Sequence, residues 1–330
     1  MRIVKTAVAA AVAVTMLGSV AAKAEEIVIK FSHVTSGTTH PKAIAANEFA
    51  KRVNEEMKGR VRIEVFPGSS LFNDDQLLIE LIKGNSVQMG SPSLSKFEKL
   101  TKKFRIFDLP FLFEDIDAVN KFQQSDKGQE LLGSMKNKGI LGLGFWHNGM
   151  KQMSANKPLL TPSDAEGLKF RVQQSDVLVA QMEALGATAQ KLAFSEVYGA
   201  LQTGVVDAQE NTWSNIYSKK FFEVQDGVTE TNHGILDYAV VVSRRFWEGL
   251  PNDVRADLER ILKEVTEERN AKSFALNQES RAKVLEAGGT IRQLAPEQRA
   301  AWVETMKPVW AKFEDEIGKD MIDAALASNK

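Results

Sequence analysis

The chain has 330 residues, of which 43% are hydrophobic and 26% are charged, and its formal net charge at pH 7 is −1. This composition is typical of a soluble globular protein with two domains or one large domain. The small net charge, without long blocks of one sign, gives no indication of binding to nucleic acid or to an anionic membrane. The absence of cysteine excludes disulfides, thiol catalysis and cysteine-ligated metal sites.

The first 24 residues have the layout of a secretory signal peptide. Arg2 and Lys5 precede an apolar stretch that ends at the A-x-A sequence Ala22-Lys23-Ala24. The alternative is an uncleaved membrane anchor, but the stretch is short and alanine-rich for a segment that needs about 20 strongly apolar residues to cross a bilayer. We therefore expect an exported protein cleaved after Ala24, with 39 basic and 43 acidic side chains and a formal charge of −4.

Predicted strands and helices alternate through the first part of the mature chain. Residues 27–33 alternate as a strand, residues 41–57 have the spacing of a helix that starts at a proline, and residues 60–67 form a second strand. "DDQLLIELIKGN" predicts a helix that ends at Gly84, and "SVQMG" predicts a third strand. This alternation indicates a mostly parallel sheet covered by helices.

The same alternation returns after residue 139. "GILGLGFW", "LKFRV" and "VVDAQEN" predict strands, "SDVLVAQMEALG" and "FSEVYGALQTG" predict helices, and "YAVVVSRRFW" predicts a further strand. Residues 252–287 predict one or two long surface helices, and residues 295–318 predict a terminal helix. The chain therefore has the pattern of an α/β protein with two lobes that part near Asn148, and we expect a ligand cleft between them.

Several polar side chains fall at or near the carboxyl ends of the predicted strands, which is where open parallel sheets bind ligands. Arg171 stands between two bulky apolar residues in the short strand "GLKFRV". A lone guanidinium is costly inside a sheet, so we expect Arg171 to meet either solvent or a negative group. The full set of such residues is His33, Ser91 to Ser93, His147, Asn148, Arg171 and Asn211.

The sequence gives no support to an enzymatic function. No two of the four histidines have the i, i+4 spacing of a helical zinc site, and the chain contains no G-x-S-x-G elbow and no Walker A loop. "GILGLG" resembles a glycine-rich loop only faintly, and the residues after it do not start a helix. Acidic residues could supply a carboxylate pair, but the sequence does not bring any two together. We therefore expect no catalysis, no metal and no cofactor.

Two segments resemble a known family: "FSEVYGALQTGVVDAQEN" (194–211) and "PLLTPSDAEGLKFRV" (158–172). Both are similar to the extracytoplasmic solute-binding proteins of tripartite ATP-independent periplasmic (TRAP) transporters. "IKFSHV", "SPSLSKF", "FWHNGMKQMSAN", "ETNHG" and "FWEGLPNDVR" further resemble the DctP branch, which binds C4-dicarboxylates. The resemblance covers essentially the whole mature chain.

The resemblance implies a two-lobed fold of the periplasmic-binding-protein type, in which each lobe is a mostly parallel sheet flanked by helices and long helices lie near the C-terminus. It implies that the chain crosses between the lobes more than once, so a single boundary at Asn148 is too simple. Residues 25–149 and 237–275 are expected to form domain I. Residues 150–236 and 276–330 are expected to form domain II.

The resemblance also implies roles for individual residues. Arg171, in the "GLKxRV" frame, is expected to bind the substrate carboxylate with two parallel N–H···O bonds, a geometry that guanidinium fits. Asn211 is expected to contact the same carboxylate, and Lys151 stands where other members have arginine. Independently of the resemblance, a second buried carboxylate would need a cation, and the candidates in this chain are Lys151, Lys42, and His33 or His40 if protonated. Weaker candidates for ligand contact are Ser93, His33, His40 and Trp213.

The expected function is capture of a C4-dicarboxylate (succinate, fumarate or malate) in the periplasm and its delivery to the small and large membrane subunits of a TRAP transporter. Three alternatives remain open at this point. The ligand could be another organic acid, such as a 2-oxo acid, lactate or an aromatic carboxylate. The protein could present its ligand to a periplasmic sensor, or it could be an enzyme without a recognisable motif.

Overall fold

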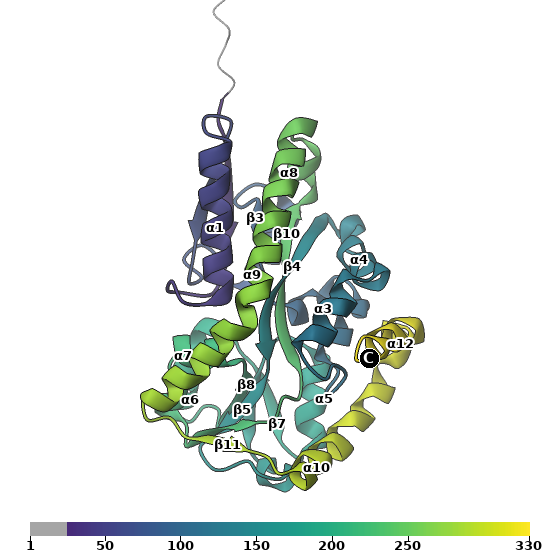
Figure 1. Ribbon diagram of the computed structural model, residues 1–330. Coiled ribbons are helices and arrows are strands. Elements are labelled where there is room, and N and C mark those ends of the chain that lie inside the picture. Colours follow the sequence, from purple (N-terminus) through teal and green to yellow (C-terminus); the bar gives the residue numbers. More distant parts are fainter. Residues whose placement is uncertain (1–24) are drawn as a thin grey trace, which may run out of the picture.

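The computed structural model describes residues 25–330, which form two α/β lobes, each built on one sheet (Figure 1). The predicted signal peptide, with its cleavage site after Ala24, lies outside the described residues. Among the helices of residues 25–330, none is both long and apolar enough to cross a membrane.

The first lobe has a five-stranded sheet in the order β2-β1-β3-β10-β4. β1 is parallel to β2 and β3, whereas β10 is antiparallel to both β3 and β4. β10 is buried along its whole length, as its run of β-branched residues predicts for a central strand. The strands are β1 (Ile27–Ser32), β2 (Val61–Phe66), β3 (Met89–Gly90), β4 (Ile140–Met150) and β10 (Ile235–Ser243).

The second lobe has a six-stranded sheet in the order β11-β9-β5-β8-β6-β7. β6 is parallel to both of its neighbours, β7 and β8, and β5 runs antiparallel to β8 and β9. Each sheet thus contains one strand that opposes the others, and the predicted mostly parallel architecture is confirmed. The strands are β5 (Gln152–Ala155), β6 (Lys169–Val172), β7 (Thr188–Lys191), β8 (Ala208–Asn211), β9 (Gly227–Glu230) and β11 (Ile291–Gln293).

Two helices of the first lobe begin beside the cleft between the lobes. Helix α1 (Pro41–Glu56) starts at a proline, and the side chain of His40 caps it by accepting the Lys42 N–H. Helix α2 (Asp74–Lys83) starts with a reciprocal capping box between Asn73 and Gln76, and it ends at the left-handed Gly84, where the sequence predicted its end. These two caps fix where the first turns of both helices stand.

The first lobe also contains helices for which the sequence analysis made no prediction. They are two 3-10 helices (Leu94–Lys99 and Lys102–Asp108) and the short helices α3 (Ile116–Gln124) and α4 (Asp126–Gly133). Apolar residues in the 3-10 stretch do not follow the 3.6-residue spacing of an α-helix, because the turn is tighter. The side chains of this region nevertheless form much of the first lobe's core.

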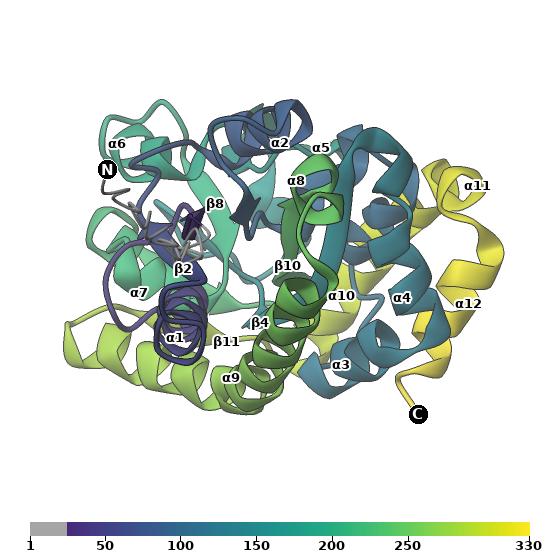
Figure 2. The ribbon, with the colours of Figure 1, turned by 90° about the horizontal axis from the view of Figure 1, so that it is seen from above.

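One long helix joins the two lobes. α9 (Asn252–Glu286) is a single helix of 35 residues that packs on α1 and β4 in the first lobe and on α7 in the second (Figures 1 and 2). It follows the short helix α8 (Arg244–Glu248). The remaining helices of the second lobe are α5 (Asp176–Ala184), α6 (Val197–Gln202) and α7 (Trp213–Ser218).

The C-terminal segment differs from the single terminal helix predicted for residues 295–318. α10 (Pro296–Met306) passes into a 3-10 helix (Lys307–Lys312) at Pro308, which has no N–H to continue an α-helix. Two short helices follow, α11 (Glu314–Ile317) and α12 (Lys319–Ala327).

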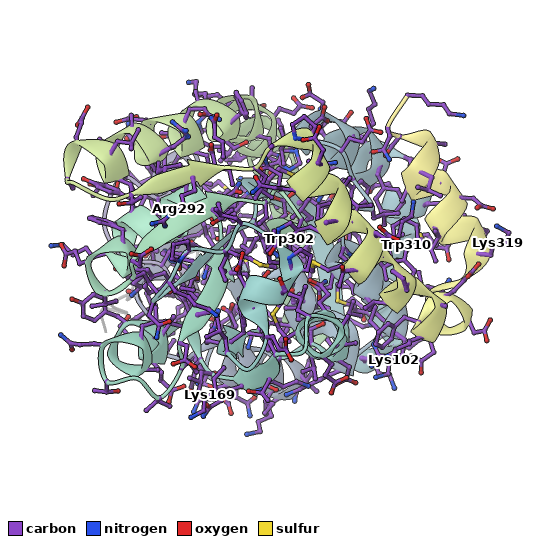
Figure 3. All side chains as sticks on the ribbon, turned by 90° about the horizontal axis from the view of Figure 1, so that it is seen from below. Lys102, Lys169, Arg292, Trp302, Trp310 and Lys319 are labelled. Atoms are coloured by element: carbon purple, nitrogen blue, oxygen red, sulfur yellow. The ribbon has the colours of Figure 1, made fainter. Side chains whose placement is uncertain are left out.

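This C-terminal segment contacts both lobes. The Trp302 indole donates to the Leu160 carbonyl of the second lobe at 3.3 Å, and the Trp310 indole donates to the Pro110 carbonyl of the first at 2.8 Å (Figure 3). α12 packs beside α3 (Figure 1). The end of the chain therefore lies on the first lobe, whereas residues 276–330 were expected in domain II; the division into domains stays a prediction.

Candidate functional site

A cavity of about 400 Å3, counted with its open mouth, lies between the two lobes. Its walls come from the starts of α1 and α2 in the first lobe and from β6, the loop after β7 and α7 in the second. The lining residues are Val34, Thr35, Lys42, Asn73 to Asp75, Ser93, Lys96, Arg171, Gln173, Ala193, Phe194, Asn215, Leu236 and Tyr238.

Arg171 stands in β6 between two strands and lines this cavity with only 1% of its surface exposed. Its Nε and Nη2 donate to the Leu192 carbonyl at 3.1 and 2.8 Å. Its Nη1 has no hydrogen-bond partner within residues 25–330. Burial lowers the pKa of Arg171 to about 10, so the guanidinium stays charged at neutral pH. One edge of the guanidinium is thus fixed by the backbone, and one amino group is available to an anion.

Lys42 supplies a second buried cation from the opposite lobe. It lies in the first turn of α1, it is fully buried, and its Nζ donates to the Ser91 carbonyl at 3.1 Å. The same Nζ is 3.9 Å from the centre of the Tyr238 ring, a cation–π contact. Burial lowers the pKa of Lys42 to about 8, with the Asp74 carboxylate acting in the opposite direction. Lys42 is therefore mostly charged at pH 7.

Acidic and hydroxyl groups complete the first-lobe wall. Asp75 accepts from Lys96 at 2.6 Å, so these two charges neutralise each other. Asp74 accepts the Ser93 backbone N–H at 3.4 Å through Oδ2. Ser93, a predicted ligand contact, lines the cavity, and its hydroxyl has no partner among the residues that the structure describes. Its role in binding stays a prediction.

A chain of hydrogen bonds connects the two lobes beside the cavity. His40 accepts the Lys42 N–H at Nδ1, which puts the ring proton on Nε2, and Nε2 donates to the Asn215 Oδ1 at 2.7 Å. Asn215 Nδ2 donates to the Asn211 Oδ1 at 2.6 Å, and Asn211 Nδ2 donates to the Gln209 Oε1 at 2.7 Å. Asn215 thus faces the cavity, while the predicted ligand contact Asn211 stands one step behind it.

His33 and His40 do not provide positive charge. Burial lowers the pKa of each to about 3, and the Lys42 ammonium acts in the same direction. His33 contacts the Thr35 hydroxyl through Nδ1 at 3.0 Å, and His40 is committed to capping α1. Neither histidine thus carries a charge at neutral pH in the ligand-free protein, and their contact with a ligand stays a prediction.

Lys151 is committed to a buried ion pair elsewhere. Its Nζ lies 2.5 Å from the Glu210 Oε2, and His233 Nε2 lies 3.3 Å from the same oxygen. Burial would raise the pKa of Glu210, but Lys151 and His233 outweigh burial and hold it below its usual value. The Lys151 charge is thus neutralised by protein groups, whereas the sequence made it a candidate for the second carboxylate.

Trp213 lies in the core of the second lobe rather than at this cavity. It packs with apolar residues that include Ile216 and Val228, and its ring is 5.9 Å from the Arg281 guanidinium carbon. It lines a different hollow, beside α9. The predicted contact of Trp213 with the ligand has no geometric support in residues 25–330.

Sequence reasoning missed several residues of the cavity wall: Asp74, Asp75, Lys96, Asn215 and Tyr238. Two signals could have found some of them. The capping box at Asn73 places Asp74 and Asp75 in a first helical turn at the end of the β2–α2 connection. Asn215 follows Asn211 by four residues, just after the strand end that the resemblance marked.

Comparison with known families identifies this fold. The sequence pattern of the family described as bacterial extracellular solute-binding protein, family 7 (DctP) matches residues 31–316. The chain belongs to this family. The resemblance found in the sequence is thereby confirmed.

Relatives within the family are similar over almost their whole length. The chain is 63% identical to the C4-dicarboxylate-binding periplasmic protein DctP of Vibrio cholerae, over 92% of each chain. It is 54% identical to the protein of the same name from Shewanella loihica, over 100% of this chain and 97% of that one.

Solved structures of family members have the same two-lobed fold. A TRAP periplasmic solute binding protein from Shewanella oneidensis with bound succinate is 51% identical, with a TM-score of 0.90 over 92% of this chain and 100% of that chain. One from Pseudomonas aeruginosa with bound L-malate is 48% identical, with a TM-score of 0.84 over 87% of this chain and 99% of that chain. The chain is thus a TRAP solute-binding protein by family and by fold.

Proposed function

We propose that this protein binds a C4-dicarboxylate such as succinate, fumarate or malate in the cavity between its lobes and passes it, chemically unchanged, to the membrane subunits of a TRAP transporter. One observation supports this most strongly. Arg171 and Lys42, both fully buried, reach the same small cavity from opposite lobes. The DctP relatives and the family structures that hold succinate and L-malate agree with this ligand class.

The placement of two cations without ion pairs in the cavity favours two carboxylates over one. Lys96 is paired with Asp75 and Lys151 with Glu210, so Arg171 and Lys42 are the cavity's cations without a carboxylate at ion-pair distance within residues 25–330. A second ionised carboxylate shut away from water costs several kcal/mol unless a cation meets it. Lys42 is such a cation: Asp74 acts on it through space but makes no ion pair with it, so a ligand carboxylate can still bind there.

Each carboxylate has a set of donors in this arrangement. Arg171 offers Nη1 to the first carboxylate, and Asn215 has a second amide hydrogen on Nδ2 beside it. Lys42 offers its ammonium to the second carboxylate, with the Ser93 hydroxyl on the same wall. Because the two carboxylates are bound from different lobes, the ligand joins the lobes when it binds.

The setting of this function follows from the family. The N-terminal layout and the periplasmic relatives support export to the periplasm with cleavage after Ala24. Delivery to the two membrane subunits and the absence of catalysis are part of the proposal. No group of three or more His, Cys, Asp or Glu side chains in the described part of the chain is placed to hold a metal ion.

A thermal-shift screen across organic acids tests this proposal. A ligand at 100 times its dissociation constant stabilises the folded state by about 2.7 kcal/mol, which raises the melting temperature measurably. Succinate, fumarate and malate are expected to do so, while lactate, 2-oxo monoacids and benzoate have little effect. A shift confined to a monocarboxylate would overturn the proposal and favour another organic acid as the ligand.

A further inference from the structure

We infer that Asp74 makes the site select hydroxylated C4-dicarboxylates, such as malate, over succinate, by accepting a hydrogen bond from the ligand hydroxyl. This inference rests on the proposed function. Its starting point is a carboxylate in the wall of a cavity that binds anions. Asp74 is 5% exposed, lines the cavity, and its Oδ1 has no hydrogen-bond partner among residues 25–330.

Acidic residues are common in the first turn of a helix, but the usual reason for this does not explain why Asp74 is buried. Acidic residues there stabilise the helix through its dipole, usually from the solvent-exposed surface. Asp74 is buried instead, and a buried carboxylate oxygen without a donor is costly. Asp75, the next residue in the same turn, shows the contrast, because both of its oxygens meet lysines, Lys96 at 2.6 Å and Lys99 at 3.5 Å.

The chemistry of the ligand decides which molecule can satisfy Asp74. An ionised succinate presents four acceptor oxygens and no donor, so it cannot donate to Asp74 Oδ1. A hydroxyl on the ligand carbon chain is both donor and acceptor. Gln173, whose Oε1 also lacks a partner in the described chain, is less informative because its amide can rotate and present the NH2 group. An ionised carboxylate can only accept hydrogen bonds, whichever way it rotates.

The test compares Asp74→Asn with Asp75→Asn by calorimetry at pH 7.5, using succinate, L-malate and D-malate. The wild type is expected to bind one enantiomer of malate at least tenfold more tightly than succinate, the size of effect expected for one hydrogen bond to a charged group. In Asp74→Asn the amide can turn its NH2 toward the cavity and donate to the ligand, so the affinity for succinate rises. The ratio of malate affinity to succinate affinity is then expected to fall to about one or below. Asp75→Asn removes the same charge from the same helical turn and should shift both affinities together, which leaves the ratio unchanged.

Three results would overturn the inference. The first is a wild type that binds succinate as tightly as both malates. The second is an Asp74→Asn protein whose ratio stays at the wild-type value. The third is succinate binding with uptake of one proton, seen as a dependence of the heat on buffer ionisation, since that proton would satisfy Asp74 without a hydroxyl. Failure of the proposed function looks different, because neither dicarboxylate would then bind the wild type.

Discussion

At the scale of single residues, Arg171 shows how an arginine can lie inside an apolar strand. Its neighbours Phe170 and Val172 are fully buried in the core of the second lobe, while Arg171 faces the cavity. The Leu192 carbonyl at the end of β7 holds two of its three nitrogens. The strand therefore fixes the direction of the guanidinium before any ligand arrives, which reduces the entropy that binding must remove.

Arg171→Ala is expected to weaken succinate binding at least about thirtyfold, because losing one side of a buried charge pair costs at least about 2 kcal/mol. Arg171→Lys should also bind much more weakly, since an ammonium cannot keep the Leu192 contact and offer a fixed donor to the ligand. Lys169→Ala is the control, because Lys169 is exposed on the same strand (Figure 3). Normal binding by Arg171→Lys in calorimetry would show that the geometry of the guanidinium is not needed.

Lys42 is expected to lower the stability of the ligand-free protein. The pKa of Lys42 is about 8 in the folded protein, against an ordinary value of 10.5. Between pH 8 and 10.5 the unfolded chain therefore binds more protons than the folded protein, and the free energy of unfolding rises with pH in this range. Below pH 8 the full cost, roughly 3 kcal/mol, is present. Lys42→Met should therefore be more stable than the wild type in urea at pH 7, and this advantage should shrink toward pH 10. A variant less stable than the wild type at both pH values would contradict this.

At the scale of secondary-structure elements, a buried arginine joins three of them. Arg105, 4% exposed in the 3-10 helix Lys102–Asp108, lies 3.1 Å from Glu98 in the first lobe and 2.6 Å from Asp176 at the start of α5. It also pairs with Glu316 of α11. Glu98 in turn accepts the backbone N–H of Asp176. This network holds the first lobe, the second lobe and the C-terminal segment together.

Arg105→Met is expected to destabilise the protein by about 3 to 5 kcal/mol, because Glu98 is left buried without its counter-charge. Arg60→Met removes an arginine that is exposed and pairs with Asp253 and Asp257 at 2.5 and 3.1 Å, so it should cost less than about 1 kcal/mol. Urea unfolding of both variants, without ligand, compares them. Equal losses would mean that burial does not determine the strength of the Arg105 network.

The sequence predicted those elements whose signals are local. α2 begins at a capping box and ends at a left-handed glycine, and both signals can be read without knowing the fold. The 3-10 stretch from residue 94 to 108 could not be predicted, because its buried side chains follow no helical period. The predicted terminal helix failed at Pro308, a breaker visible in the sequence but given too little weight.

The same division applies to the site. Arg171 could be predicted because a charged residue in an apolar strand needs a partner. Lys151 has equally clear charge, but its commitment to Glu210 depends on the pairing of β5 with β8, which the sequence does not show. Asn215 was missed for a similar reason, since the cavity faces the first turn of α7 rather than the end of β8, where the predicted Asn211 lies.

At the scale of the whole molecule, the cavity exists because the chain crosses between the lobes several times. β4 of the first sheet passes into β5 of the second, and β9 of the second sheet passes back into β10 of the first. α9 and the C-terminal segment add two more connections. Side chains also bridge the lobes, as in the bond of His40 to Asn215 and the bond of Asn148 to Ser214 at 2.5 Å. Arg171 and Lys42 thereby meet one ligand from two sides.

The central claim is that these two cations each bind one carboxylate, and calorimetry with succinate and butyrate tests it most directly. The two ligands have the same chain length and differ by one carboxylate. The wild type is expected to bind succinate at least tenfold more tightly, and Lys42→Met is expected to reduce this difference to within about threefold. Equal affinities in the wild type, or a difference that persists undiminished in Lys42→Met, would contradict the claim.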